Sequence, residues 1–132
     1  MFTETILTTA QPTRNILAAL TSALGDYIVY EQDEVTFIVA QPVWEFTLHG
    51  GHDTPWDAVR DAIQGTDYAH DQAIYGWVGF ELASGGAAGQ EIAHFLIPGI
   101  EIRIAGENVT IRTSDDVAPD VVAQLRSIIE SA

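Results

Sequence analysis

The chain has 132 residues and a formal net charge of −14, from 19 acidic residues against five arginines and no lysine. This length predicts one domain, residues 1–132, with one ordinary core, and the 47% hydrophobic fraction excludes a disordered acidic tail. Nucleic acid and anionic membrane surfaces would be repelled, so neither is expected as a partner. The absence of lysine excludes Schiff-base chemistry, and the absence of cysteine excludes disulfides and thiolate nucleophiles.

No targeting or membrane segment is evident. No charged region precedes an apolar segment at the N-terminus, and no apolar run approaches the roughly 20 residues that cross a bilayer. We therefore expect a cytoplasmic protein. The strong acidity is also typical of a highly soluble or salt-adapted protein.

The first half of the chain alternates between strand and helix patterns. Residues 2–9 favour a strand, and apolar residues at helical spacing predict a helix over 12–24. Two β-rich runs, 27–31 and 35–40, then predict a hairpin around residues 32–34. Pro42 interrupts the second run, so its extension to Leu48 is expected to be an edge strand or to lie beyond a bulge.

That extension alternates in polarity. Its odd positions, Glu45, Thr47 and His49, are expected to face solvent, while Trp44, Phe46 and Leu48 face the core. A helix should follow, with Thr54 as its N-cap, Pro55 at its first position and Gly65 after its end. Its predicted apolar stripe contains Trp56, Val59, Ala62 and Ile63.

The most apolar stretch runs from Ile74 to Ala83. It is short, β-branched and aromatic, and it predicts a strand that is buried on both faces. Gly76 and Gly79 lie within it, and a glycine inside a strand often marks a place where another backbone or a ligand comes close. We therefore expect Gly76, Trp77, Gly79 and Glu81 to form a contact or pocket strand.

The last third predicts two more strands and a helix. Runs at 94–98 and 100–104 are separated by a kink at Pro98 and Gly99, a turn at 106–108 leads to a strand at 109–113, and a helix opens near Asp115, Asp116 and Pro119. Most consecutive strands are joined by hairpins. The sequence therefore predicts the α+β class, with an antiparallel sheet of about six strands covered by two or three helices.

Two polar features are candidate sites. His49, His52 and Asp53 lie in a glycine loop and could ligate a divalent metal, but no third or fourth ligand with defined spacing stands nearby, so surface histidines in a turn are the alternative. Glu81, within an apolar strand, could act as an acid or base, or it could pair with an arginine. No Walker or nucleophile-elbow pattern is present, and no catalytic residue is assigned.

A family resemblance adds to this interpretation. The segment Gly76–Ala83 (GWVGFELA), followed by residues 94–104 (HFLIPGIEIRI), resembles the N-terminal region of chorismate-utilising enzymes. It is most similar to salicylate synthases, with isochorismate and anthranilate synthases further away. The resemblance covers residues 27–130 in order, and its motifs are structural strands rather than catalytic motifs.

The resemblance implies a fold in which two sheets pack face to face, and an activity on chorismate that needs magnesium. The family's catalytic residues belong to a C-terminal portion, and none matches a position in this chain. The expected function is therefore a non-catalytic N-terminal domain or subunit of a salicylate-synthase-like enzyme, which serves siderophore or secondary-metabolite biosynthesis. Its expected partner is a catalytic chorismate-binding domain or a second copy, with no cofactor in this chain and magnesium in the catalytic portion.

Two alternatives belong to other classes. The chain could be a stand-alone small-molecule-binding or protein-interaction module, in which the glycines of the central strand and the loop 49–53 line a pocket or a dimer contact. It could also be a metal-dependent enzyme through His49 and His52.

Overall fold

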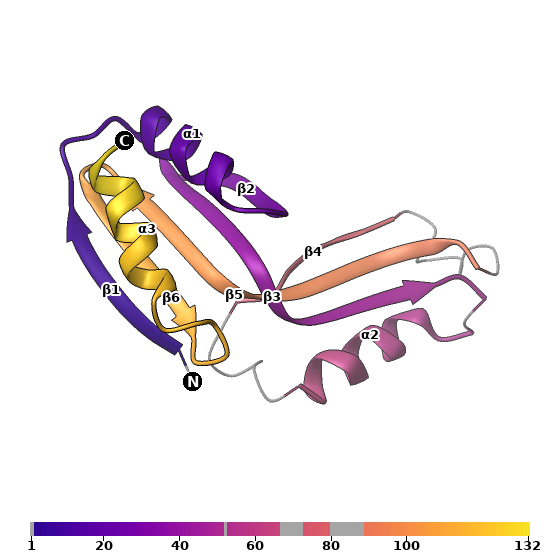
Figure 1. The fold of residues 1–132 in the computed structure, drawn as a ribbon. Coiled ribbons are helices and arrows are strands. Elements are labelled where there is room, and N and C mark those ends of the chain that lie inside the picture. Colours follow the sequence, from indigo (N-terminus) through magenta and orange to yellow (C-terminus); the bar gives the residue numbers. More distant parts are fainter. Residues whose placement is uncertain (1, 52, 67–72, 80–88) are drawn as a thin grey trace. The chain divides into compact units, whose positions relative to one another are not determined.

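The computed structural model describes residues 2–51, 53–66, 73–79 and 89–132 (Figure 1). They form six strands and three helices, which confirms the α+β class. In chain order these are β1 (Phe2–Thr8), α1 (Thr13–Ala23), β2 (Tyr27–Gln32), β3 (Val35–His49), α2 (Pro55–Gln64), β4 (Tyr75–Val78), β5 (Glu91–Ala105), β6 (Asn108–Ser114) and α3 (Val121–Glu130).

The strands form one hydrogen-bonded sheet in the order β1-β6-β5-β3-β2, and β4 pairs with β5 outside this path. The registers of β1 with β6, β2 with β3, β4 with β5 and β5 with β6 are all antiparallel. The antiparallel sheet and the helices are therefore as predicted. The longest of the three helices has 11 residues, and none is long and apolar enough to cross a membrane.

The chain divides into two compact units. The terminal unit contains Met1–Gln41 and Pro98–Ala132, and the middle unit contains Pro42–Ile97. Because β3 and β5 contribute residues to both units, the expectation of a single domain stays a prediction.

Each boundary between the units falls directly before a proline of a long strand. The sequence predicted an interruption at Pro42 and a kink at Pro98, and in the structure β3 and β5 each run through the proline as one strand of 15 residues. Proline lacks the N–H that a sheet ladder uses. At the first boundary Gln41, directly before Pro42, has a φ of 50°, in the left-handed region.

The terminal unit has a core between its sheet and two helices. Every second residue of the paired strands faces α1 and α3, which contact each other over the sheet (Figure 1). The core contains Leu7, Ile16, Leu20, Ile38, Ile100, Ile102, Ile104, Val109, Ile111, Leu125 and Ile129. Helix α3 begins at Val121, later than the predicted start near Pro119.

Two-residue turns close both hairpins of this unit. Asp33 and Glu34 have φ values of 52° and 67°, which match a type I′ turn although neither residue is glycine. In the second hairpin Gly106 has a φ of 62°, where glycine has no steric cost. These turns bring the flanking strands into the registers Gln32 with Val35 and Ala105 with Asn108.

The middle unit has its own small core under α2. Leu48, Val59, Ile92 and Ala93 are buried together, and Phe46, Ala58, Ile63 and Phe95 pack against them. Thr54 and Pro55 occupy the predicted N-cap and first helical positions, although the Thr54 side chain makes no capping hydrogen bond. Trp56 is 59% exposed, so its placement on the buried stripe was wrong.

Strand β4 differs most from its prediction. Its described residues are not buried on both faces: Trp77 is 48% exposed and Val78 is 43% exposed. Strand β4 pairs with β5 outside the main strand order. Its apolar residues therefore lie at the surface rather than in the centre of the sheet. The predicted continuation of this strand over 80–83 lies outside the described residues.

Candidate functional site

The middle unit has a sheet face that carries polar and aromatic side chains. Thr47 and Glu45 alternate with the core residues Phe46 and Leu48 along β3, so they point away from α2. His94 lies opposite them on β5, and Trp77 of β4 is the register partner of His94. We call Glu45, Thr47, Trp77 and His94 the His94 face.

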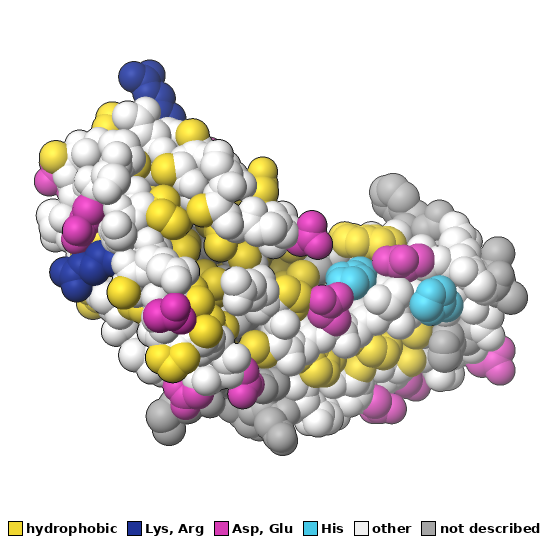
Figure 2. All heavy atoms as spheres, viewed as in Figure 1, with side chains coloured by type: hydrophobic (Ala, Val, Ile, Leu, Met, Phe, Trp, Pro, Cys, Tyr) yellow, Lys and Arg dark blue, Asp and Glu magenta, His cyan; other side chains and the backbone are white. Residues whose placement is uncertain are grey.

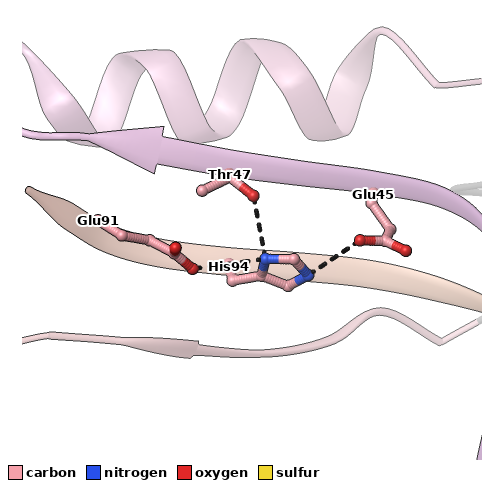
Figure 3. Close-up of polar contacts among 4 residues, drawn as sticks. All are labelled: Glu45, Thr47, Glu91 and His94. Atoms are coloured by element: carbon pink, nitrogen blue, oxygen red, sulfur yellow. Dashed lines mark hydrogen bonds and ion pairs between the residues drawn. The ribbon is translucent and has the colours of Figure 1, made fainter. Parts of the chain in front are cut away.

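The imidazole of His94 contacts side chains on both sides (Figure 3). Its Nδ1 is 3.0 Å from Thr47 Oγ1 and 3.7 Å from Glu91 Oε1, and its Nε2 is 3.3 Å from Glu45 Oε2. The His94 side chain is 26% exposed, whereas those of Glu45 and Glu91 are about half exposed, at 51% and 48%. The ring is therefore held in place while both carboxylates reach solvent.

The donor and acceptor roles in these contacts depend on which ring nitrogen carries a proton. With a proton on Nε2 alone, the N–H lies beside the Glu45 carboxylate and Nδ1 is free to accept from the Thr47 hydroxyl. In this state both ring nitrogens have partners and the two carboxylates keep their negative charges. Protonation of the ring would add a donor toward Glu91 and cancel one of those charges.

The charge environment of this face is acidic. Residues 42–97 contain eight acidic residues and a single arginine, Arg60. Arg60 is already paired, since its guanidinium lies 3.2 Å from Asp57 and 3.5 Å from Asp61 on the exposed side of α2. Figure 2 shows histidine side chains close to acidic ones on the visible surface of this unit.

Two of the predicted contact residues lie beside β5. A Cβ on Gly76 would overlap the carbonyl oxygen of His94 and lie 2.8 Å from Phe95 Cδ1. The N–H of Gly79 donates to the carbonyl of Ile92 at 2.8 Å. The structure thus shows a neighbouring backbone against both glycines, while Glu81 lies outside the described residues.

The predicted metal loop is only partly described. His49 and Asp53 are exposed, and His52 lies outside the described residues. Asp53 lines a shallow hollow with Thr54, Pro55, Trp56 and Asp57 at the start of α2. Over the described ranges, no group of three or more His, Asp or Glu side chains is arranged to hold a metal ion.

Comparison with known proteins gives no family. No family model matches the sequence, and no curated protein is a significant match.

The sequence interpretation did not select His94, Glu45 or Thr47 as a site. Glu45 and Thr47 were placed correctly on a solvent-facing side of their strand, and His94 was assigned to a strand. The missing information was the pairing of β3 with β5, which brings residues 47 positions apart into contact. A polar pair at i and i+2 within an apolar strand is the only signal in the sequence, and many solvent faces share it.

Proposed function

We propose that this chain is a non-catalytic scaffolding portion of a chorismate-utilising enzyme of the salicylate-synthase type. In this role the terminal unit docks its sheet against a catalytic portion that supplies magnesium binding and the reacting groups. The sequence resemblance motivates the family, and the exposed apolar side chains on one sheet face of the terminal unit carry the proposal.

That face lies opposite α1 and α3. Ile6 on β1 is 69% exposed and Ile28 on β2 is 39% exposed, whereas the next residue of each strand, Leu7 or Val29, packs in the core under the helices. A sheet that is covered by helices on one side and exposes apolar side chains on the other is typical of a layer that packs against a further layer. The exposed isoleucines therefore support a docking role.

Aromatic rings and arginines share this face in ordered pairs. Tyr30 and Phe37 stack with their centroids 4.6 Å apart, and the Arg103 guanidinium carbon lies 5.6 Å from the centroid of Phe37. Arg112 lies 5.3 Å from the centroid of Phe2. Such planar groups bury a large area with little loss of conformational entropy, which favours an interface.

The charges on this face also balance. Glu4 and Glu101 are register partners of Arg112, and Arg103 lies on the same side of β5 as Glu101. The Glu4 carboxylate is 3.4 Å from Arg112 Nη1. Two acidic and two basic residues thus cancel on this face, although the whole chain has a net charge of −14. A protein layer can cover such a face at a lower desolvation cost than it could cover an unbalanced acidic face.

A reconstitution experiment tests the proposal. The chain is titrated into a salicylate-synthase fragment that lacks its N-terminal portion, with magnesium and chorismate, and isochorismate and salicylate are measured. We expect saturable restoration of activity. Ile6→Glu should weaken the apparent affinity, because it buries a carboxylate in the interface. Val78→Glu is the control, because it introduces the same carboxylate at an exposed β4 side chain of the middle unit. Unchanged activity at saturating chain, with no change in amide chemical shifts, would contradict the proposal.

A further inference from the structure

The His94 face offers a second interaction surface, on a different unit from the one used above. We propose that it binds a basic segment of a partner protein, with an arginine or lysine side chain over the indole of Trp77 and within reach of Glu45 and Glu91. The inference does not depend on the chorismate-enzyme proposal, because it uses no residue of the terminal unit.

Charge complementarity determines the chemistry of the occupant. The only arginine of residues 42–97 is bound by Asp57 and Asp61 on α2. Among the described residues of this unit, His94 is the group that lies beside Glu45 and Glu91, and it forms ion pairs with them only when its ring is protonated. With the ring neutral, Glu45 and Glu91 keep a charge of −2 on a half-exposed surface, and a charged carboxylate has several acceptor sites for further donors. A cationic side chain of a partner protein would neutralise the carboxylates of Glu45 and Glu91.

Trp77 determines which kind of cation fits. Its side chain is 48% exposed and stands beside His94, since directly paired residues of antiparallel strands have Cβ atoms roughly 5 Å apart. A guanidinium or ammonium over an exposed indole gains a cation–π interaction, which a hydrated metal ion does not gain in the same way. The indole and the carboxylates together thus favour an arginine or lysine side chain.

The width of the face indicates a peptide rather than a single small cation. Glu45 lies on β3 and Trp77 on β4, with β5 between them. Two strand spacings of about 4.8 Å separate the outer residues, so the face is about 10 Å wide. A lone ammonium group contacts one end of such a surface, whereas an extended segment with alternate basic side chains contacts both ends. The long-range attraction of a net charge of −14 would also speed the encounter with a basic partner.

The test uses the ¹⁵N-labelled full chain and two peptides. One is a capped five-residue peptide that alternates glycine and arginine, and the other has citrulline in place of each arginine, which keeps the shape and removes the charge. We expect the arginine peptide to cause saturable shifts of the Trp77 indole N–H, the His94 ring and the amides of β4 and β5, and the citrulline peptide to cause none. Trp77→Val assigns the indole signal.

Variants that remove the same charge at different places distinguish binding at the His94 face from general attraction between the acidic chain and the basic peptide. Glu45→Gln and Glu91→Gln should each raise the dissociation constant about two- to five-fold, the effect of one exposed ion pair, and Trp77→Val should raise it about three-fold. Glu34→Gln removes the same charge from the exposed β2–β3 turn of the terminal unit and should change the dissociation constant by less than about 1.5-fold.

Three results would overturn the proposal. The first is an equal effect of Glu34→Gln and Glu45→Gln, which means nonspecific attraction. The second is a set of shifts centred on α2 and not on β4 and β5. The third is binding of free argininamide as tight as that of the peptide, which assigns the face to a small cation. Because these readouts need no chorismate and no catalytic fragment, their failure is independent of the reconstitution result.

Discussion

The hydroxyl of Thr47 and Nδ1 of His94 lie 3.0 Å apart and join two strands of the middle unit across 47 residues of sequence. The bond is half-buried, and it fixes the ring between Glu45 and Glu91. Its geometry therefore links the stability of the β3–β5 pairing to the orientation of the imidazole.

Replacement of Thr47 by valine tests this bond. Thr47→Val keeps the β-branched shape but removes the donor, so we expect the free energy of unfolding to fall by about 1 kcal/mol. Urea unfolding measures the change, and the ¹⁵N shifts of the His94 ring report the tautomer. Thr8→Val is the matched control, because Thr8 is an exposed strand residue on β1. Equal effects of the two variants would mean that the Thr47 bond adds no stability.

Gly76 is predicted to tolerate no side chain. A Cβ there would lie 2.8 Å from Phe95 Cδ1 and 2.9 Å from Phe95 Cα, and it would overlap the His94 carbonyl oxygen. Because two of these three atoms belong to the backbone, β4 would have to move away from β5. We expect Gly76→Ala to lower the free energy of unfolding by about 2 kcal/mol or more, as for other overpacked positions.

Gly25→Ala is the comparison for that experiment. A Cβ on Gly25 meets no atom within 4 Å, and its φ lies outside the left-handed region. We expect this change to be neutral or to stabilise the chain by up to about 1 kcal/mol, since alanine lowers the entropy of the unfolded chain. Chemical denaturation of both variants gives the contrast. A Gly76→Ala variant as stable as Gly25→Ala would refute the close approach of β4 to β5.

A single substitution in the β2–β3 turn is predicted to stabilise the chain. Glu34 has a φ of 67°, in a region that costs a non-glycine residue roughly 1 kcal/mol or more. Glu34→Gly removes this cost and yields the Asp-Gly pair that type I′ turns favour, so we expect a gain of about 0.5 kcal/mol in the free energy of unfolding. Gly106→Ala, at a φ of 62° in the other hairpin, should have the opposite sign. Thermal melts of the two variants that shift in the same direction would contradict this account.

The sequence predicted elements well where a local rule decides them. Strand β1, helix α1 and both hairpins follow from hydrophobic period and turn residues, and each was found at the expected place. The continuity of β3 through Pro42 and of β5 through Pro98 was not predicted, because proline constrains its own φ and removes one donor but does not by itself end a strand. Both prolines stand at the boundary of the two compact units instead.

Position within the sheet was not predictable from the same rules. The apolar run at β4 looks like a central strand, but Trp77 and Val78 are exposed because only pairing decides which strands lie inside. For the same reason the candidate site was missed. His94, Glu45 and Thr47 come together through the register of β3 and β5, and no spacing in the sequence encodes that register.

Two isoleucines on opposite faces of the terminal unit allow the effect of a substitution on stability to be measured separately from its effect on docking. Ile102 on β5 is fully buried against the helices, whereas Ile6 on β1 is 69% exposed. We expect Ile102→Val to lower the free energy of unfolding by about 1 kcal/mol, the usual cost of one buried methylene, and Ile6→Val to change it by less than about 0.3 kcal/mol. In the reconstitution assay we expect Ile6→Val to have the larger effect on affinity, because the proposed complex places Ile6, and not Ile102, in contact with the partner. Urea unfolding and activity titration of both variants check this, and a stability loss at Ile6 that equals the loss at Ile102 would show that the isolated chain already buries this face.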